Sequence, residues 1–406
     1  MSGSLSPTLA RVVGHGLCSG CGACAAITPS VVSMEMTEEG LLRPTQSEPI
    51  NADQDRAIAN VCPGVSLHQT STEGVDDPLW GPVVRARTGW ATDPALRYAA
   101  SSGGGLSAVL VSLLASKRVD AVLQTRANRD EPLGTETTLS RTAADVLEAS
   151  GSRYAPSAPL TIVSDLLDSQ ERIAFVGKPC DVAALRAMAR HDDRINRVFP
   201  VLISFFCAGV PSQRGAEKIL TALQVERSEV TAFRYRGYGW PGFATATLRD
   251  GQEAKMSYFD SWGGILSANV QARCRICPDG TGGFADIVCA DAWETDEQGY
   301  PIFEERDGIS LVLSRTKLGE AIVSEASKTD HIEVKDFDLA DLAAMQPGQL
   351  SKRQLTLPRM IGLRIMGRPV PRYGGFYLLR NMKTARPGVI AKNFLGMIRR
   401  VLSGRI

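Results

Sequence analysis

The chain has 406 residues, of which 44% are hydrophobic and 22% charged, and its formal net charge is +1. This composition is typical of a globular protein of about two or three domains and excludes a disordered or fibrous chain. The longest apolar runs, residues 106–115 and 198–210, are shorter than the ~20 residues of a membrane-spanning helix, and no secretory signal opens the chain, so we expect a cytoplasmic protein.

The first predicted element is a cysteine motif in residues 17–29, "LCSGCGACAAITP". Its three cysteines follow the C-x2-C-x2-C spacing with which bacterial ferredoxins hold a [4Fe–4S] cluster, but Thr28 occupies the usual position of the fourth ligand. The Cys-Pro unit in "VCPG", residues 61–64, supplies a remote fourth ligand. We expect one cluster here, with a zinc knot as the alternative. Its ligands are Cys18, Cys21, Cys24 and Cys62.

The chain divides into three predicted domains. Residues 1–75 form a small ferredoxin-like segment that needs the cluster as a staple, because it contains too little apolar sequence for a core of its own. Residues 80–330 form an α/β domain. Residues 335–406 form a C-terminal extension of several short helices.

Strands and helices alternate through the α/β domain, which predicts a mostly parallel sheet. Strands are expected at residues 81–90, 120–126, 172–177 and 199–207, and helices at 142–150, 160–169 and 181–191. The glycine-rich "SSGGG" opens a further helix within residues 101–119, with Ser102 as its predicted cap. Two β-rich segments, residues 229–251 and 285–293, are expected as insertions or an antiparallel extension.

Two polar features of this domain allow more than one interpretation. The loop at residues 101–105 is either a cradle for a phosphate or a simple tight entry to the helix. The segment "FRYRGYGWPGF", residues 233–243, is either a stacking surface for a planar ligand or a hairpin packed around Trp240. The acidic body of the protein argues against a nucleic-acid partner.

A second cysteine set is expected at one edge of the sheet. Cys180 follows the strand at 172–177, and Cys207 ends the strand at 199–207, so parallel strands bring both to the same edge. Cys274 and Cys277 form a bare C-x2-C pair that suits zinc, a redox dithiol or a cluster. We expect the four to converge on a second cluster, with zinc as the rival. Cys289 is interpreted as a small buried hydrophobic residue within a strand.

The C-terminal tail differs in charge from the rest of the chain. Residues 351–406 contain thirteen Lys or Arg and no acidic residue, so the first 350 residues carry 32 basic and 44 acidic side chains, a balance of −12. Its last segment, residues 386–406, has the pattern of a basic amphipathic helix. We expect it to contact an acidic protein or a membrane surface, or to pack as a solvated helix.

In combination these motifs resemble one known family. Over roughly residues 15–300, the chain resembles the beta-subunit family of deazaflavin (coenzyme F-420) reducing hydrogenases and dehydrogenases. That family also includes 7-hydroxymethyl chlorophyll a reductase and a divinyl chlorophyllide reductase. The motifs that carry the resemblance are "CSGCGAC", "CPG", "SSGGGLSAVL", "GSRY", "GKPCDVAALR", "FFCAGVPS", "YRGYGWPG" and "CRICPDGTGGFADIVCADAW".

The resemblance implies FAD and one or two [4Fe–4S] clusters. It implies cluster ligands at Cys180, Cys207, Cys274 and Cys277, the set already grouped by the strand order. The chain departs from the family at Lys178 and Ala290, where a threonine and a glycine are usual. Implied FAD neighbours lie in three loops: Ser101, Ser102, Gly103, Gly104 and Gly105; Gly151, Ser152, Arg153 and Tyr154; and Gly177, Lys178 and Pro179.

We therefore expect an iron–sulfur flavoprotein oxidoreductase with two [4Fe–4S] clusters and FAD. Electrons enter from ferredoxin or another redox protein, collect as a pair on the flavin and pass to a small organic acceptor. The acceptor is a deazaflavin, a tetrapyrrole or another metabolite. An electron-transfer subunit without its own substrate site and a zinc-stapled binding module are the alternatives. A homo-oligomer is considered, and no catalytic residue is predicted.

Overall fold

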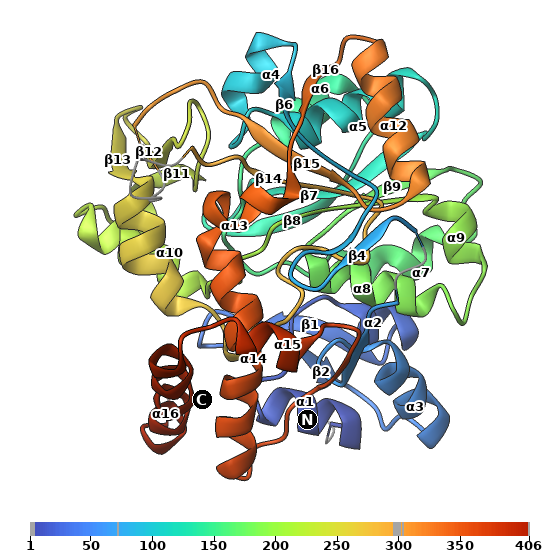
Figure 1. Cartoon of the computed structure of the whole chain (residues 1–406), viewed down its shortest axis with the longest axis vertical. Helices are drawn as coiled ribbons and strands as arrows, with labels where there is room; N and C mark the ends of the chain where they lie inside the picture. Colours follow the sequence, from blue (N-terminus) through green and yellow to red (C-terminus); the bar gives the residue numbers. More distant parts are fainter. Residues whose placement is uncertain (1–4, 71–72, 295–301, 303, 405–406) are drawn as a thin grey trace.

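The computed structural model of the chain describes residues 5–70, 73–294, 302 and 304–404. Parts of the predicted N-terminal segment (1–4 and 71–72) and the end of the basic tail, with Arg405, therefore lie outside the described residues. An eight-stranded sheet in the order β16-β6-β15-β14-β10-β9-β7-β8 forms the centre of the protein (Figure 1). The predicted α/β class is confirmed.

The sheet is mixed rather than mostly parallel, which corrects the expectation. The four central strands run parallel: β14 (Ile287–Asp291), β10 (Val201–Phe205), β9 (Ile173–Val176) and β7 (Ala121–Ala127). The outer strands pair antiparallel: β8 (Thr135–Ser140), β15 (Ser310–Ser314), β6 (Arg85–Ala91) and β16 (Ile332–Asp336). The apolar pattern missed this because all five residues of β15 are buried, as in a parallel strand.

Helices cover both faces of this sheet. Side chains of β7 alternate, so that Val122 packs under α5 (Gly105–Ala115) and α12 (Lys317–Lys328), whereas Leu123 packs with α8 (Pro179–Met188). In Figure 1, α5 and α12 lie at the top and α8 lies below the sheet. Most predicted elements are confirmed within a few residues, including α6 (Ala143–Glu148) and the pair η1 (Pro159–Ile162) and α7 (Val163–Leu166).

The two β-rich segments belong to different sheets in the structure. The first forms a separate antiparallel sheet of β11 (Val230–Arg234), β12 (Phe243–Leu248) and β13 (Glu253–Ser257), as expected of an insertion. The second contains β14, which lies within the main sheet, parallel to β10 and antiparallel to β15, so it is not an insertion but the strand at which the antiparallel part of the sheet begins. Trp240 is buried between β11 and β12, which confirms the packed-hairpin interpretation.

The N-terminal segment packs against both the sheet domain and the C-terminal helices. It contains α1 (Pro7–Gly14), α2 (Ala23–Ile27), the hairpin β1 (Val32–Met36) and β2 (Leu42–Gln46), α3 (Ala52–Val61) and β3 (Ser66–His68). Helix α3 begins at a reciprocal capping box between Asn51 and Gln54. Strand β3 pairs in parallel with β17 (Arg372–Gly374), which ties the two ends of the chain together.

The C-terminal extension contains two substantial helices rather than several short ones. They are α14 (Pro347–Ile365) and α16 (Pro387–Leu402), with the short α13 (Leu342–Met345) and α15 (Leu378–Lys383) beside them. Among the described residues, no helix is long and apolar enough to cross a membrane. The other elements are β4 (Val75–Asp77), β5 (Gly81–Val83), α4 (Pro94–Ala99), α9 (Arg194–Val198), α10 (Gln213–Ala222), η2 (Arg227–Glu229), η3 (Phe259–Ile265), η4 (Leu266–Asn269), α11 (Ala272–Arg275) and η5 (Leu339–Asp341).

Candidate functional site

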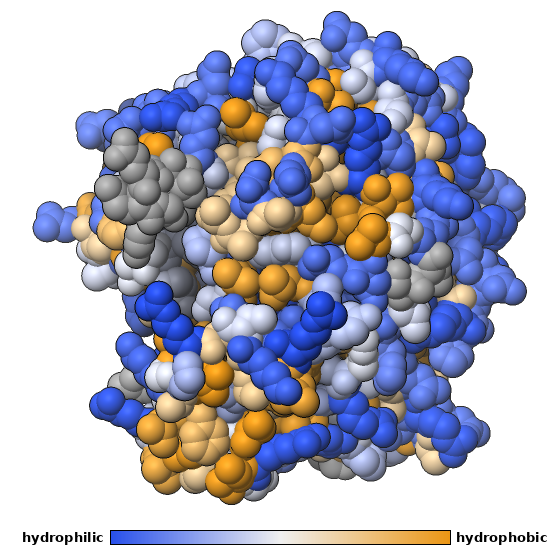
Figure 2. Space-filling view, in the orientation of Figure 1, coloured by the Kyte–Doolittle hydropathy of each residue, from blue (hydrophilic) through white to orange (hydrophobic). Residues whose placement is uncertain are grey.

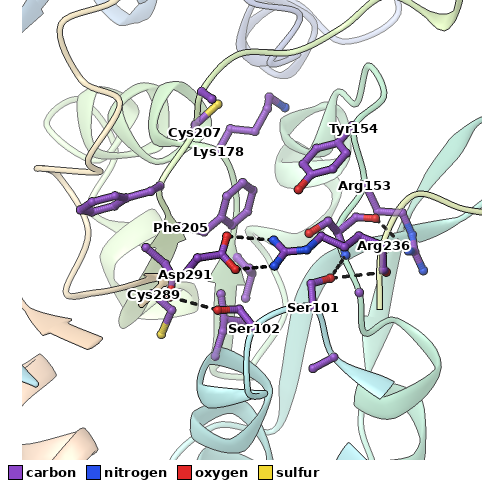
Figure 3. A pocket seen from close by; sticks show the side chains of 18 of the residues that line it. Ser101, Ser102, Arg153, Tyr154, Lys178, Phe205, Cys207, Arg236, Cys289 and Asp291 are labelled. Atoms are coloured by element: carbon purple, nitrogen blue, oxygen red, sulfur yellow. Dashed lines mark hydrogen bonds and ion pairs between the residues drawn. The ribbon is translucent and has the colours of Figure 1, made fainter. Parts of the chain in front are cut away.

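A cavity of about 290 Å³ opens where the parallel strands β9, β10 and β14 end (Figure 3). Open α/β sheets bind their ligands at this edge, and the volume is at the lower end of the range for ligand pockets, roughly 300–1,000 Å³. Of the twelve residues predicted to contact FAD, all but Gly103 and Pro179 line it. The cavity therefore brings the three predicted loops to one place.

The glycine-rich loop at residues 101–105 is shaped by close backbone packing. Gly103 and Gly104 both adopt left-handed conformations, with φ of +66° and +72°. A Cβ on Gly103 would lie 2.5 Å from the carbonyl oxygen of Gly308. Gly104 is the N-cap of α5, which corrects the predicted cap at Ser102. The Ser102 hydroxyl instead donates to the carbonyls of Ala290 and Ile309, at 3.2 Å each.

A buried ion pair forms another part of the cavity wall. Arg236 donates two hydrogen bonds to Asp291, at 2.8 and 2.6 Å (Figure 3). The indole N–H of Trp240 donates to the same carboxylate at 3.0 Å. Burial opposes the charge on Arg236, but Asp291 raises its pKa above the usual value. Arg236 also lies over the ring of Tyr258, which stacks on Trp293. This network fixes an aromatic wall beside the cavity.

A second cationic group at the cavity has no counter-charge. Arg153 donates to the carbonyls of Ser150 and Ser152, at 3.1 and 3.2 Å, and its buried Nε has no partner. Burial, and then the neighbouring Arg234, lower the pKa of Arg153 to about 10. Neither Arg153 nor Arg234 forms an ion pair with a carboxylate in the part of the chain that the structure describes. Both arginines are half-buried, and Arg153 lines the cavity, so two cations side by side at this point suit an anionic ligand such as a diphosphate.

Lys178 lies between the cavity and the cysteines. Its buried ammonium contacts Asp181 at 2.8 Å and donates to the hydroxyl and carbonyl of Ser157, at 2.8 and 3.1 Å. Burial disfavours this charge, but Asp181, together with the thiols of Cys180 and Cys21, raises the pKa of Lys178. The side chain thus places a satisfied positive charge close to one cysteine of each predicted set.

The four cysteines of the first set lie close to one another. Burial, and then the thiols of Cys21, Cys18 and Cys62, raise the pKa of Cys24 well above its usual value. The same order of causes, burial followed by Cys21 and Cys18, raises the pKa of Cys62 to about 12. The backbone N–H of Gly20 points to the sulfur of Cys18, 3.4 Å away. Thr28 is not part of this group, because its hydroxyl donates to the Cys24 carbonyl.

Cys207, Cys274 and Cys277 of the second set form another group. Cys180 lies between this group and the first set. Burial raises the pKa of Cys207 to about 12; Lys352 opposes this, whereas Cys274 and Cys277 add to it. For Cys180, burial comes first and Asp181 second in raising the pKa, and the thiols of Cys207 and Cys21 contribute less. The N–H of Val210 contacts the sulfur of Cys274 at 3.3 Å.

Buried basic groups surround the second set. Arg273 donates to the carbonyl of Pro63, next to Cys62, at 2.9 Å, but its buried Nε and Nη1 have no partner. Arg353 is likewise buried with an unpartnered Nε. Lys352 donates to the carbonyl of Cys207 at 2.9 Å. An anionic group held by the thiolates would balance these charges, so the residues fit an iron–sulfur cluster.

The thiols do not form a closed single-ion site. Among the described residues, no three Cys, His, Asp or Glu side chains are placed to hold one metal ion. A tetrahedral zinc site has Zn–S bonds of about 2.3 Å, which bring its sulfurs roughly 4 Å apart. A cube has an iron atom for each thiolate, and its ligands stand farther apart.

Two residues of the 285–293 block gain defined positions. Asp286 accepts from Arg186 and from the backbone N–H of Leu202, both at 2.8 Å, and so joins α8 to β10. Cys289 is a buried core residue, as predicted, although it also contributes to the cavity floor. Arg236 and Asp291, 55 residues apart, were not predicted as a pair. The available signal in the sequence was an arginine among aromatic residues in "YRGYGW" and an aspartate at the end of an apolar strand.

Comparison with known proteins adds sequence and fold relatives. Two models of the family "Coenzyme F420 hydrogenase/dehydrogenase, beta subunit" match, the N-terminal one over residues 86–164 and the C-terminal one over residues 170–340. The coenzyme F420 hydrogenase beta chain of Methanococcus voltae is 25% identical over 293 residues, which cover 69% of this chain and 95% of the relative. One chain of the F(420)H(2) dehydrogenase of Methanosarcina mazei is 23% identical over 320 residues, covering 78% and 84%.

A solved structure has the same fold. A chain of the F420-reducing NiFe hydrogenase complex from Methanosarcina barkeri superposes with a TM-score of 0.52 at 21% identity. The match covers 69% of this chain and 95% of that chain. Helices α14, α15 and α16 lie beyond residue 340, outside both matched family regions.

Proposed function

Because the chain belongs to the coenzyme F420 hydrogenase/dehydrogenase beta-subunit family, we propose that it is an iron–sulfur flavoprotein oxidoreductase with two [4Fe–4S] clusters and FAD. Its relatives are subunits of hydrogenases and dehydrogenases, which supports an electron-transfer oxidoreductase subunit. The finer proposal includes a redox-protein donor such as ferredoxin, a small organic acceptor and a cytoplasmic location. The division into domains 1–75, 80–330 and 335–406 belongs to the same proposal.

One observation carries this proposal: two sets of thiols and a ligand-sized cavity adjoin one another at Lys178. Cys180 and Cys21 both influence that lysine, which also lines the cavity. A flavin, when bound, supplies chemistry that links one-electron donors to two-electron organic acceptors. Proximity of the thiol sets to the cavity is what such a protein requires.

Two parts of the cavity would hold FAD. The first turn of α5 and the loop before it offer backbone N–H groups, and Arg153 with Arg234 adds positive charge for the diphosphate. The aromatic wall, fixed by the ion pair of Arg236, would cover a planar ring and exclude water from it. A dinucleotide would extend beyond the enclosed volume toward the open side.

Each cysteine set would hold one cluster. Cys18, Cys21, Cys24 and Cys62 would ligate the first, and Cys180, Cys207, Cys274 and Cys277 the second. Backbone N–H groups directed at sulfur, as at Cys18 and Cys274, stabilise electron-rich thiolates. Arg273, between the two sets, would neutralise charge near both.

The cavity favours an enzyme over a pure electron-transfer subunit. Its lining includes Tyr154, Tyr258, Trp262 and Trp293, and these rings suit a planar heteroaromatic acceptor placed against the flavin. The names of the relatives make a deazaflavin the first acceptor to test. A tetrapyrrole is the second, since its ring is also planar.

Anaerobic purification tests the proposal. Flavin absorbance over a broad brown shoulder, with about eight iron atoms per chain from two four-iron clusters and FAD released on denaturation, is expected. A colourless protein loaded with zinc would refute it. Hydride exchange with reduced deazaflavin, against a reduced tetrapyrrole control, then identifies the acceptor class.

A further inference from the structure

Three arginines from separate elements gather above the second cysteine set. Arg275, on α11, directly follows Cys274, and its carbonyl accepts from Arg359 of α14 at 3.0 Å. Arg359 is held in turn by Asn393 of α16, through contacts of 3.0 and 2.8 Å. Arg400, on the next turns of α16, completes what we call the arginine cluster: Arg275, Arg359 and Arg400.

The charges of the arginine cluster are not balanced. None of the three forms an ion pair with a carboxylate in the described residues, and residues 351–406 contain no acidic side chain. Burial, and then Arg275 and Arg400, lower the pKa of Arg359 to about 10, so the three charges repel one another. Such an arrangement costs stability in the isolated chain, and an acidic partner would relieve it.

Apolar side chains are exposed on the outer surface of the same two C-terminal helices. Ile365, Leu395 and Leu402 are 64%, 59% and 73% exposed on α14 and α16. Figure 2 shows orange surface gathered at the lower left, over the position of these two helices in Figure 1. Exposed apolar residues beside uncompensated arginines are typical of a protein-interaction surface.

We propose that the arginine cluster, together with the exposed apolar residues of α14 and α16, forms the docking site of a small acidic redox protein that donates electrons to the second cysteine set. This rests on the proposed function for the iron–sulfur cluster itself, but the recognition depends only on the surface. The rest of the chain is net negative by −12 over 350 residues, so an acidic donor would be repelled elsewhere and guided to this face.

The position of the arginine cluster favours a redox protein over a membrane. Arg275 is the residue after Cys274, and the α14 side chains of Lys352 and Thr356 contact the backbones of Cys207 and Cys277. A partner seated here would therefore approach the cysteines through a single layer of helices. A lipid surface would gain nothing from that proximity.

Binding of a plant-type ferredoxin to the full chain tests the proposal. Calorimetry is done with the wild type, with Arg400→Glu and with Lys328→Glu, a matched charge reversal on exposed α12 at the far end of the molecule. We expect Arg400→Glu to weaken binding about tenfold and Lys328→Glu to leave it unchanged. Raising salt from ~20 to ~300 mM should weaken the wild type far more than Arg400→Glu.

The other outcomes overturn the docking site. Equal affinity of ferredoxin for the wild type, Arg400→Glu and Lys328→Glu would show that the arginine cluster is not its docking site. Arg400-dependent binding to vesicles of phosphatidylcholine and phosphatidylserine would also remove it, because it would assign the face to a membrane. Iron and flavin are measured on the same samples. Ferredoxin binding by a chain that lacks clusters would refute the proposed function and leave the surface intact, so the two failures are distinguishable.

Discussion

Replacing Arg153 with methionine should move stability and FAD binding in opposite directions. Methionine keeps much of the length of the side chain but removes a half-buried charge that has no carboxylate partner among the described residues. Burial, and then the neighbouring Arg234, lower the pKa of Arg153 to about 10, a change that corresponds to about 3 kcal/mol against the charged form.

That figure is reduced by two effects. The side chain is only half-buried, so water in the open cavity screens part of the cost. Arg153 also donates two hydrogen bonds to carbonyls that the variant loses, each worth about 1 kcal/mol. The cofactor-free variant should therefore be more stable than the wild type by about 1 kcal/mol, seen as a higher urea midpoint with an unchanged slope.

FAD binding should weaken in the same variant. Loss of one charge-assisted contact to a diphosphate costs roughly 1.5–3 kcal/mol, which is roughly a 10- to 100-fold rise in the dissociation constant. Fluorescence titration of apoprotein with FAD, and with riboflavin as a phosphate-free control, measures this. Riboflavin affinity should not change. Arg141→Met, at an exposed arginine paired with Glu171, is the matched substitution. A variant that is less stable and binds FAD normally would show that Arg153 is only a structural hydrogen-bond donor.

Further substitutions test the remaining parts of the structure. Cys62→Ser should remove about half of the iron and leave FAD bound, because the two thiol sets are separate; full iron content would refute the remote ligand. Asp291→Ala should lower the free energy of unfolding by about 3–5 kcal/mol, since it leaves the buried Arg236 without its counter-ion, whereas Asp291→Asn should lose less; denaturation by urea compares them, and equal stabilities would argue against a buried pair. Burial opposes ionisation of Glu320, but hydrogen bonds from Arg87 and Ser324 and the charge of Arg87 lower its pKa. A lowered pKa means that Glu320 stabilises the fold above its unfolded pKa of about 4.3 and that this contribution is lost as the pH falls below it. The urea midpoint of wild type should therefore fall more steeply between about pH 5 and 3 than that of Glu320→Gln, and parallel curves would contradict the assignment.

The strand ends were predictable because their chemistry is local. "RIAFVG" and "VLISFF" each place a cysteine just after a continuous apolar strand, and β9 and β10 are indeed parallel neighbours. The carboxyl ends of parallel strands share an edge, so Cys180 and Cys207 were expected on one side of the sheet. At that edge the structure places Cys180 near Lys178 and Cys207 near Lys352.

The outer sheet was not predictable in the same way. An interior strand is apolar on both faces whether its neighbours run parallel or antiparallel, so composition did not distinguish β15 or β14 from other buried strands. Strand direction is decided by connections through segments far apart in the chain, such as β6 and β15, which lie over 200 residues apart. No local pattern records that choice.

Paired and unpaired arginines were missed for a similar reason. Arg236 is neutralised by Asp291 from a different sheet, whereas Arg153 and Arg234 lie beside each other without an acid. In the sequence all three are ordinary arginines near glycines and aromatics. Only the fold determines which of them finds a carboxylate, and it is the ones without a carboxylate that fit an anionic ligand.

The parallel pairing of β3 with β17 has a consequence for the order in which the chain folds during its synthesis. The strand that follows Cys62 receives its partner from residues 372–374, about 300 positions later in the chain. Val12 and Leu17 share a small core with Ile276, Met360 and Met397. On the ribosome, the first thiol set therefore remains without its packing partners until nearly the whole chain has emerged, since domains fold only as their segments appear. Iron insertion into a packed site would follow release of the finished chain, and a nascent chain arrested before α14 should be sensitive to thiol-modifying reagents at Cys18.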